Sequence, residues 1–231
     1  MNEAARLLGE AARGLADHLR FQQALGVREL PLTQDYLAGP DAALRRLERE
    51  IAGCTRCKLS QGRNTIVFGS GAPGARLVFI GEGPGEEEDR QGLPFVGRAG
   101  QKLTEMLAAV GVTREEVYIC NIVKCRPPGN RNPEPDEIAS CAPFLAGQLT
   151  AIRPGVIGAL GTFAAQTLLR TKEPISRLRG RLHEYGAAVI VPTFHPAFII
   201  RNPGLEYRKQ AFEDMKLIRR EYDRVRGIAS G

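Results

Sequence analysis

From residue 76 onward, short apolar runs alternate with segments whose apolar residues recur every three or four positions. Runs of the first kind are typical of buried strands, and spacing of the second kind is typical of amphipathic helices. This alternation favours a parallel sheet with helices on both faces. We therefore expect a three-layer α/β/α fold with a central, mostly parallel four-stranded sheet. The expected strands are 76–82, 116–123, 155–160 and 188–195, with helices at 98–110, 134–152, 162–170 and the end of the chain.

The chain divides near residue 40. Residues 3–26 are rich in Ala and Leu at helical spacing, and the stretch after them has the composition of a linker. We expect residues 1–40 to form an N-terminal helical extension with its linker, and residues 41–231 to form one globular domain. With 43% apolar residues, the chain can bury a substantial core.

Composition narrows the class of protein. No apolar stretch approaches the roughly 20 residues of a membrane helix, and the N-terminus lacks the pattern of a secretory signal. We therefore expect a cytoplasmic protein without membrane contact. The formal net charge of +6 favours a polyanionic partner. Residues 170–181 carry five basic side chains and one acid, so we expect them to contact phosphates.

Polar side chains end three of the expected strands: Glu82, Asn121 and His195. Each alone has an ordinary explanation, as a helix cap, a strand end or a buried histidine. Ligands of open α/β sheets bind outside the carboxyl ends of the strands, which share one edge. We therefore expect the acid, the amide and the imidazole to converge in one site.

The cysteines form a second group. Cys54 and Cys57 make a CxxC, Cys125 and Cys141 flank a proline-rich loop, and Cys120 lies inside an expected strand. In a cytoplasmic chain such a set favours metal binding over disulfides. Four thiolates can hold zinc or an iron–sulfur cluster, and spacing alone does not separate the two.

The loop GEGPGEEEDRQGLPFVG, residues 81–97, combines five glycines with five acids. Its glycines are spaced G-x-G-x-G and no Gly-Lys-Ser/Thr follows, so it matches neither a dinucleotide fingerprint nor a P-loop. The acids would repel a pyrophosphate. We infer that the glycines let the backbone approach a flat, neutral ligand.

Four ordered blocks follow the CxxC: GEGPGEEEDRQGLPFVGRAGQKL, NIVKCRPPGNRNP, CAPFL and HPAFIIRNP. With the cysteines they resemble the family 4 uracil-DNA glycosylases, the iron–sulfur branch of that superfamily, over about residues 45–222. The resemblance implies a uracil-DNA glycosylase-like fold and a monofunctional enzyme for base excision repair of deaminated cytosine. Such an enzyme flips uracil out of DNA, hydrolyses the N-glycosidic bond and leaves an abasic site. Its partner is uracil-containing DNA, and we expect it to act as a monomer.

The resemblance also implies roles for single residues at the base. Phe95 would stack on the extruded uracil, Asn121 would read its edge, and His195 would donate to uracil O2. The loop that lines the pocket would be Gly81, Glu82 and Gly83.

A [4Fe-4S] cluster is implied as well, and Cys120 is left as a structural residue. The implied ligands are Cys54, Cys57, Cys125 and Cys141. Glu88 and Asn130 match a polar pair that we expect to connect the first motif with the cysteine loop.

The group that positions the attacking water is not assigned by the resemblance. Related family 1 enzymes have an aspartate where this chain has Gly83. The candidates are Glu82, Glu88 and Asn130, with the carboxylates first because they also stabilise a cationic sugar.

DNA contacts follow from this substrate. We expect Pro196 and Phe198 near the gap left by the flipped nucleotide. The expected phosphate contacts are Arg177, Arg179, Arg181 and Arg201.

Two other classes of function remain open at this point. The first is a non-catalytic nucleic-acid-binding module with an iron–sulfur or zinc staple. The second is a small-nucleotide enzyme on a doubly wound sheet, which the acidic loop and its glycine spacing disfavour.

Overall fold

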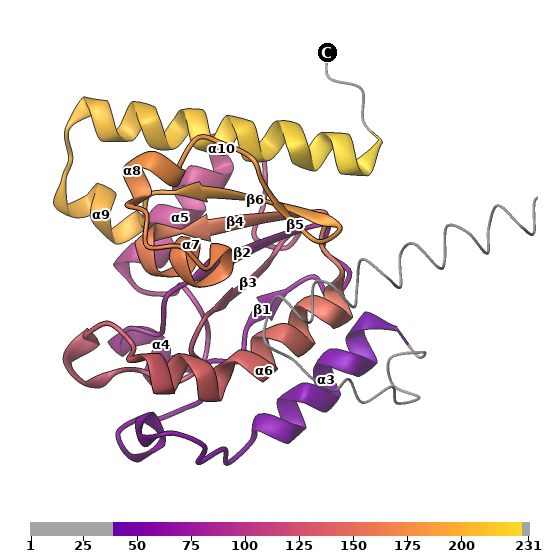
Figure 1. Ribbon diagram of the computed structural model, residues 1–231, viewed down its shortest axis with the longest axis vertical. Helices are drawn as coiled ribbons and strands as arrows, with labels where there is room; N and C mark the ends of the chain where they lie inside the picture. The colour runs from indigo at the N-terminus through magenta and orange to yellow at the C-terminus, as the bar shows by residue number, and fades with distance from the viewer. Residues whose placement is uncertain (1–38, 228–231) are drawn as a thin grey trace, which may run out of the picture.

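The centre of the molecule is a twisted sheet between two helical layers (Figure 1). The structure, a computed structural model, describes residues 39–227. Within these residues, six strands lie in the order β1-β3-β2-β4-β6-β5. The four inner strands are parallel, which confirms the expected central sheet. They are β3 (Tyr118–Asn121), β2 (Leu77–Gly81), β4 (Val156–Leu160) and β6 (Ala188–Thr193).

Two short strands at the edges were not expected from the sequence. β1 (Ser70–Gly71) pairs antiparallel with β3, and β5 (His183–Tyr185) pairs antiparallel with β6. At two and three residues, they are too short to show an apolar period. The sheet is therefore mostly parallel with an antiparallel strand at each side.

Helices cover both faces of the sheet, as expected. One face packs against α3 (Pro40–Ile51), α6 (Pro135–Ile152) and α7 (Gly161–Leu169), and the other against α5 (Arg98–Ala108) and α10 (Leu205–Arg226). In Figure 1, α10 runs along one side of the sheet, and α6 and α3 lie on the opposite side. Residues 39–227 also contain three shorter α-helices, α4 (Glu86–Gln91), α8 (Ile175–Leu178) and α9 (Pro196–Arg201).

The central strand β2 divides the core into two clusters. Val78 and Ile80 belong to the cluster on the α3, α6 and α7 face, and Leu77 and Phe79 belong to the one facing α5 and α10. All four side chains are 0% exposed. Because successive strand residues point to opposite faces, a continuous apolar run is what a strand covered on both faces requires. Each such side chain stabilises the fold by about 1.5–3 kcal/mol.

The expected extension over residues 1–40 lies outside the described residues, apart from Gly39 and Pro40, where α3 begins. Within residues 39–227, no helix has the length and apolar character needed to span a membrane.

Candidate active site

A pocket of about 590 Å³ opens at the carboxyl ends of the parallel strands. All four inner strands, or the residues directly after them, contribute to it: Glu82 after β2, Asn121 in β3, Gly161 after β4, and His195 after β6. The acid, the amide and the imidazole expected at one edge of the sheet therefore do lie together. The wall also includes Gly83, Pro84, Gly85, Glu88, Phe95, Ala99, Pro127, Asn130, Arg131, Asn132, Thr162, Phe163, Ile175, Phe194, Ala197, Phe198 and Arg201.

Gly81, Phe95 and Asn121 meet at one corner of this site. Gly81 and Asn121 are register partners on β2 and β3. A Cβ atom on Gly81 would overlap both the Asn121 Oδ1 atom and the Phe95 ring. Only glycine therefore allows the amide and the aromatic ring to approach each other here.

Asn121 has an unused acceptor. The residue is 1% exposed, and its Oδ1 atom is buried with no hydrogen-bond partner among residues 39–227. The Asn121 backbone carbonyl accepts a hydrogen bond from the buried Lys124 Nζ at 2.8 Å, which holds the end of β3. An unsatisfied buried acceptor costs about 1–3 kcal/mol, so a ligand N–H group here would be favoured.

Phe95 forms an apolar wall beside it. The residue is 6% exposed and has φ 54°, a left-handed conformation that is uncommon for a bulky side chain. Its ring centroid lies 5.7 Å from that of His195, with 34° between the planes. Two rings and an amide thus surround one region of the pocket.

His195 is held in one tautomer by the start of α9. Its Nδ1 atom accepts a hydrogen bond from the backbone N–H of Ala197 at 3.1 Å. Burial, and then the charge of Arg201, lower the pKa of His195 to about 4, so the ring is neutral at pH 7. With Nδ1 as the acceptor, the proton is on Nε2. His195 is therefore a neutral N–H donor.

Glu82 is half-buried beside these groups, immediately after β2. Burial raises its pKa to about 7. A carboxyl group with this pKa is partly ionised at neutral pH and can accept a proton.

The expected pair between Glu88 and Asn130 does not form, although both residues line the pocket. Glu88 Oε1 instead accepts the backbone N–H groups of Val96 and Gly97 at 3.0 and 2.9 Å. These residues follow Phe95 and precede α5, so Glu88 holds the loop that carries the ring.

Asn130 is bound elsewhere. Its Oδ1 atom accepts a hydrogen bond from Arg126 Nε at 2.8 Å. The connection between the first motif and the cysteine loop is made instead by Arg126 Nη2 and Glu86 Oε2, 3.5 Å apart.

Cys125 and Cys141 belong to the core cluster on the α3, α6 and α7 face of the sheet, and Cys54 and Cys57 pack against that cluster. Burial raises the pKa of Cys125, although the hydrogen bond from Arg63 and its charge act in the opposite direction. Burial likewise raises the pKa of Cys141 to about 11, with smaller contributions from Cys125 and Cys57. Cys120 lies on β3, and burial is the main cause of its raised pKa.

Hydrogen-bond donors also point at two of these thiols. Cys125 Sγ accepts from Arg63 Nη1, and Cys141 Sγ accepts from the backbone N–H of Lys124, each at 3.3 Å. Such donors suit thiolate ligands of a metal or cluster. Within residues 39–227, no three His, Cys, Asp or Glu side chains are already arranged around a single point as a metal site.

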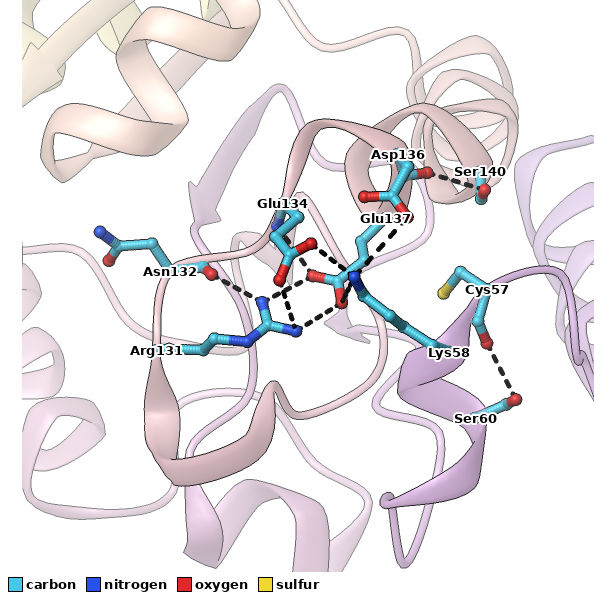
Figure 2. Close-up of polar contacts among 9 residues, drawn as sticks. All are labelled: Cys57, Lys58, Ser60, Arg131, Asn132, Glu134, Asp136, Glu137 and Ser140. Atoms are coloured by element: carbon cyan, nitrogen blue, oxygen red, sulfur yellow. Dashed lines mark hydrogen bonds and ion pairs between the residues drawn. The ribbon is translucent and has the colours of Figure 1, made fainter.

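An ion-pair network joins the CxxC segment to the rim of the pocket (Figure 2). Lys58, next to Cys57, contacts Glu134 and lies 4.0 Å from Glu137. Arg131 binds both oxygens of the fully buried Glu137 at 2.6 and 2.9 Å and donates to the backbone carbonyl of Asn132 at 2.9 Å. Since Arg131 and Asn132 line the pocket, this network connects the two sites.

The expected DNA contacts fall into two groups. Arg177, Arg181 and Arg201 are exposed, and Arg201 lines the pocket. Arg179 instead binds the buried Asp214 at 2.6 and 2.9 Å. Pro196 is buried at the start of α9, and Phe198 lies in the pocket wall.

Several lining residues were missed in the sequence. Gly161 and Thr162 follow β4, the one inner strand for which the sequence analysis predicted no site residue. Gly161 has φ +89°, and a Cβ atom there would come within 2.8 Å of the His195 Cβ atom. The position of this glycine directly after an apolar strand was the available signal. Arg131 and Asn132 were visible only as part of a proline-rich loop.

Comparisons with known proteins identify the family. Residues 68–216 match the model of the uracil DNA glycosylase superfamily. A type-4 uracil-DNA glycosylase of Thermotoga maritima is 46% identical over 172 residues, covering 74% of this chain and 90% of that protein. One from Archaeoglobus fulgidus is 44% identical, covering 76% of this chain and 92% of that protein. A type-5 uracil-DNA glycosylase of Pyrobaculum aerophilum is 27% identical, covering 67% and 82%. The chain therefore belongs to the uracil-DNA glycosylase superfamily.

Proposed function

We propose that this protein is a uracil-DNA glycosylase that flips uracil out of DNA and hydrolyses its N-glycosidic bond, leaving an abasic site for base excision repair. The unsatisfied Asn121 Oδ1 atom, buried beside Phe95, is the observation that carries the proposal. Uracil N3–H can donate to this atom, and the amide N–H₂ can donate to uracil O4. Cytosine has an acceptor at N3, so it leaves Oδ1 unsatisfied.

Phe95 supplies the energy that holds the base outside the helix. Stacking a base on an aromatic side chain contributes about 1–3 kcal/mol. Flipping the base costs a few kcal/mol. Stacking and the hydrogen bonds to Asn121 together offset this cost.

His195 stabilises the leaving group. When the bond between C1′ and N1 breaks, its electron pair moves to uracil, and negative charge builds on O2. The Nε2–H group of the neutral His195 ring donates a hydrogen bond to O2 and so stabilises this charge. Removing one such preorganised donor lowers the rate about 10²- to 10³-fold.

Glu82 is the best-placed group to orient the water and take its proton. The water oxygen attacks C1′, and its proton passes to the Glu82 carboxylate. One oxygen of Glu88 is already bound by two backbone amides, and the Asn130 Oδ1 atom is bound by Arg126. We therefore place Glu82 ahead of Glu88 and Asn130 in this role.

Four thiols are proposed as ligands of a [4Fe-4S] cluster. The ligands are Cys54, Cys57, Cys125 and Cys141. The donor set and the two hydrogen bonds to sulfur support this assignment. When bound, the cluster supplies a cross-link between the CxxC segment and the loop at the pocket rim. A brown protein with broad visible absorbance indicates iron and sulfur, and a colourless one indicates zinc.

Three exposed arginines are proposed to contact DNA phosphates. These are Arg177, Arg181 and Arg201, and such contacts position DNA without reading its sequence. We propose that the protein acts as a monomer on uracil-containing DNA.

A cleavage assay on an oligonucleotide with one uracil tests the function. The parent protein should produce an alkali-labile site, and His195→Ala should lower kcat about 10²- to 10³-fold. Asn121→Ala should raise KM and reduce the preference for uracil over cytosine. No adduct should be trapped by borohydride, because a water molecule attacks. A parent protein that binds DNA and leaves every strand intact would instead be a non-catalytic binding module.

A further inference from the structure

Arg179 differs from the other arginines of residues 170–181 because its guanidinium group is bound inside the protein. Its Nε and Nη2 atoms donate to the two carboxylate oxygens of Asp214 at 2.9 and 2.6 Å. Nη2 also donates to the backbone carbonyl of Gln210 at 2.6 Å. The side chain is 15% exposed. Three charge-assisted hydrogen bonds leave this guanidinium poorly placed to bind a phosphate.

Asp214 connects this arginine to the end of β6. The carboxylate is 0% exposed, and its Oδ2 atom also accepts a hydrogen bond from Thr193 Oγ1 at 2.8 Å. Thr193 is the last residue of β6 and lies two positions before His195. One buried carboxylate therefore joins α10, the segment after α8 and the strand that leads to His195.

Phe194, directly before His195, is held by the same arginine. Arg179 Cζ lies 5.0 Å from the centroid of the Phe194 ring, a cation–π contact. The ring also stacks on Phe198 with centroids 4.9 Å apart. Both residues that precede His195 are thus fixed through Arg179 and Asp214.

We propose that Arg179 is a positioning residue that, together with Asp214, fixes the end of β6 and so places the His195 N–H donor in the pocket. It does so without contacting a DNA phosphate. This inference rests on the proposed role of His195. A displacement of about 1 Å in a catalytic group can lower the rate about 10²-fold, so loosening this support should act on kcat.

Two variants test the support directly. Arg179→Lys keeps the charge and loses the bidentate geometry, and Thr193→Val is nearly isosteric and removes only the hydrogen bond to Asp214. We expect kcat on a uracil oligonucleotide to fall about 10- to 100-fold in the first and by a smaller factor in the second. KM should change less than twofold. If Arg179 served only to contact a DNA phosphate, Arg179→Lys would keep the positive charge and kcat would equal that of the parent.

Salt dependence separates positioning from phosphate binding. In the double variant Arg179→Gln, Asp214→Asn, both charges of the buried pair are removed together, so no charge is left unpaired. Its slope of log affinity against log salt should equal that of the parent. A lost phosphate contact would reduce the slope by about 0.9 on duplex DNA.

The imidazole nitrogen resonances of His195 give a readout that needs no activity. They should shift or broaden in Arg179→Lys and Thr193→Val. The matched control Arg220→Lys alters an arginine that is 62% exposed on α10 and lies 3.6 Å from Glu221, and it should leave both kcat and these resonances unchanged. The proposal is overturned by parental kcat and His195 resonances in both variants, or by a reduced salt slope in the double variant. If the parent excises no uracil, the proposed function fails, while the His195 resonances still decide the positioning role.

Discussion

At the scale of single residues, burial acts in opposite directions on the two titrating groups of the pocket. It raises the pKa of Glu82 to about 7 and lowers that of His195 to about 4. Both shifts have the same main cause, because a poorly solvated site disfavours the charged form of either group, and the charge of Arg201 adds to the shift of His195. At neutral pH the pocket therefore holds a neutral imidazole donor and a carboxyl group that can exchange a proton with water.

The rate should follow the ionisation of Glu82. Because only the carboxylate can accept the water proton, kcat should rise as the pH increases through about 7 and level off above it. His195 does not contribute to this limb, since it stays neutral above its pKa of about 4. Steady-state kinetics between pH 5 and 9 measure the profile.

Glu82→Gln is the matched variant for this profile. It should lower kcat about 10²- to 10⁴-fold and remove the rise near neutral pH. An unchanged profile in this variant would show that another group takes the proton.

At the scale of secondary-structure elements, the start of α6 is the strongest polar junction near the site. Glu137 is 0% exposed, binds Arg131 through both oxygens and accepts the backbone N–H of Glu134 at 2.8 Å. This capping box closes the first turn of the helix. The Glu137 carboxylate therefore caps the first turn of α6 and also binds Arg131, which lines the pocket.

Glu137→Ala should lower the free energy of unfolding by about 2–4 kcal/mol, since it removes a cap and a charge-assisted pair. Urea denaturation at pH 7 measures the change. Hydrogen bonding to Arg131 lowers the pKa of Glu137, so this stabilisation is complete above 4.5, the ordinary value, and is lost as the pH falls below it. The difference between parent and variant should shrink accordingly in acid.

Glu86→Ala is the control for this junction. Glu86 is 77% exposed and lies 3.5 Å from Arg126, so its removal should cost less than about 1 kcal/mol. Equal losses in the two variants would contradict the special role of Glu137.

At the scale of the whole molecule, two distant parts of the chain meet beside one edge of the sheet. The CxxC precedes the first strand, whereas Cys125 follows β3 and Cys141 lies on α6. The ion pairs of Figure 2 already join these parts through Lys58. A metal centre at the four thiols would add a covalent cross-link at the same junction.

Cys54→Ala should therefore reduce both bound metal and thermal stability. A metal centre would close the loop between the CxxC and Cys125. In the chain-entropy model, closing a loop of this length stabilises a fold by about 4 kcal/mol, or roughly 10 °C in melting temperature. Metal analysis and calorimetry measure the two effects. The control Cys120→Ala should keep the parental metal content, and a loss of metal there would contradict the assignment of four ligands.

The sequence was most informative where a local pattern sufficed. Apolar runs located the four inner strands, and because parallel strands share one carboxyl edge, the order of residues alone predicted that Glu82, Asn121 and His195 meet. β1 and β5 could not be predicted, because strands of two and three residues have no period.

Arginines of one basic run could not be told apart. Arg177 and Arg179 are two positions apart, yet only Arg179 meets Asp214, which lies 35 residues further along the chain. The partners of Glu88 could not be predicted from the sequence either. They are the backbone N–H groups of Val96 and Gly97, and only the folded loop after Phe95 brings these groups to the carboxylate.

What the sequence by itself determined is the order of the main helices and the four inner strands, and the residues delivered to the pocket. These depend on spacing along the chain and on side-chain chemistry. Only the tertiary structure decided the partner of each charged side chain, the tautomer of His195 and the raised pKa of Glu82. Those properties depend on hydrogen bonds of a few ångströms and on exclusion from water, and both arise when segments far apart in the sequence pack together.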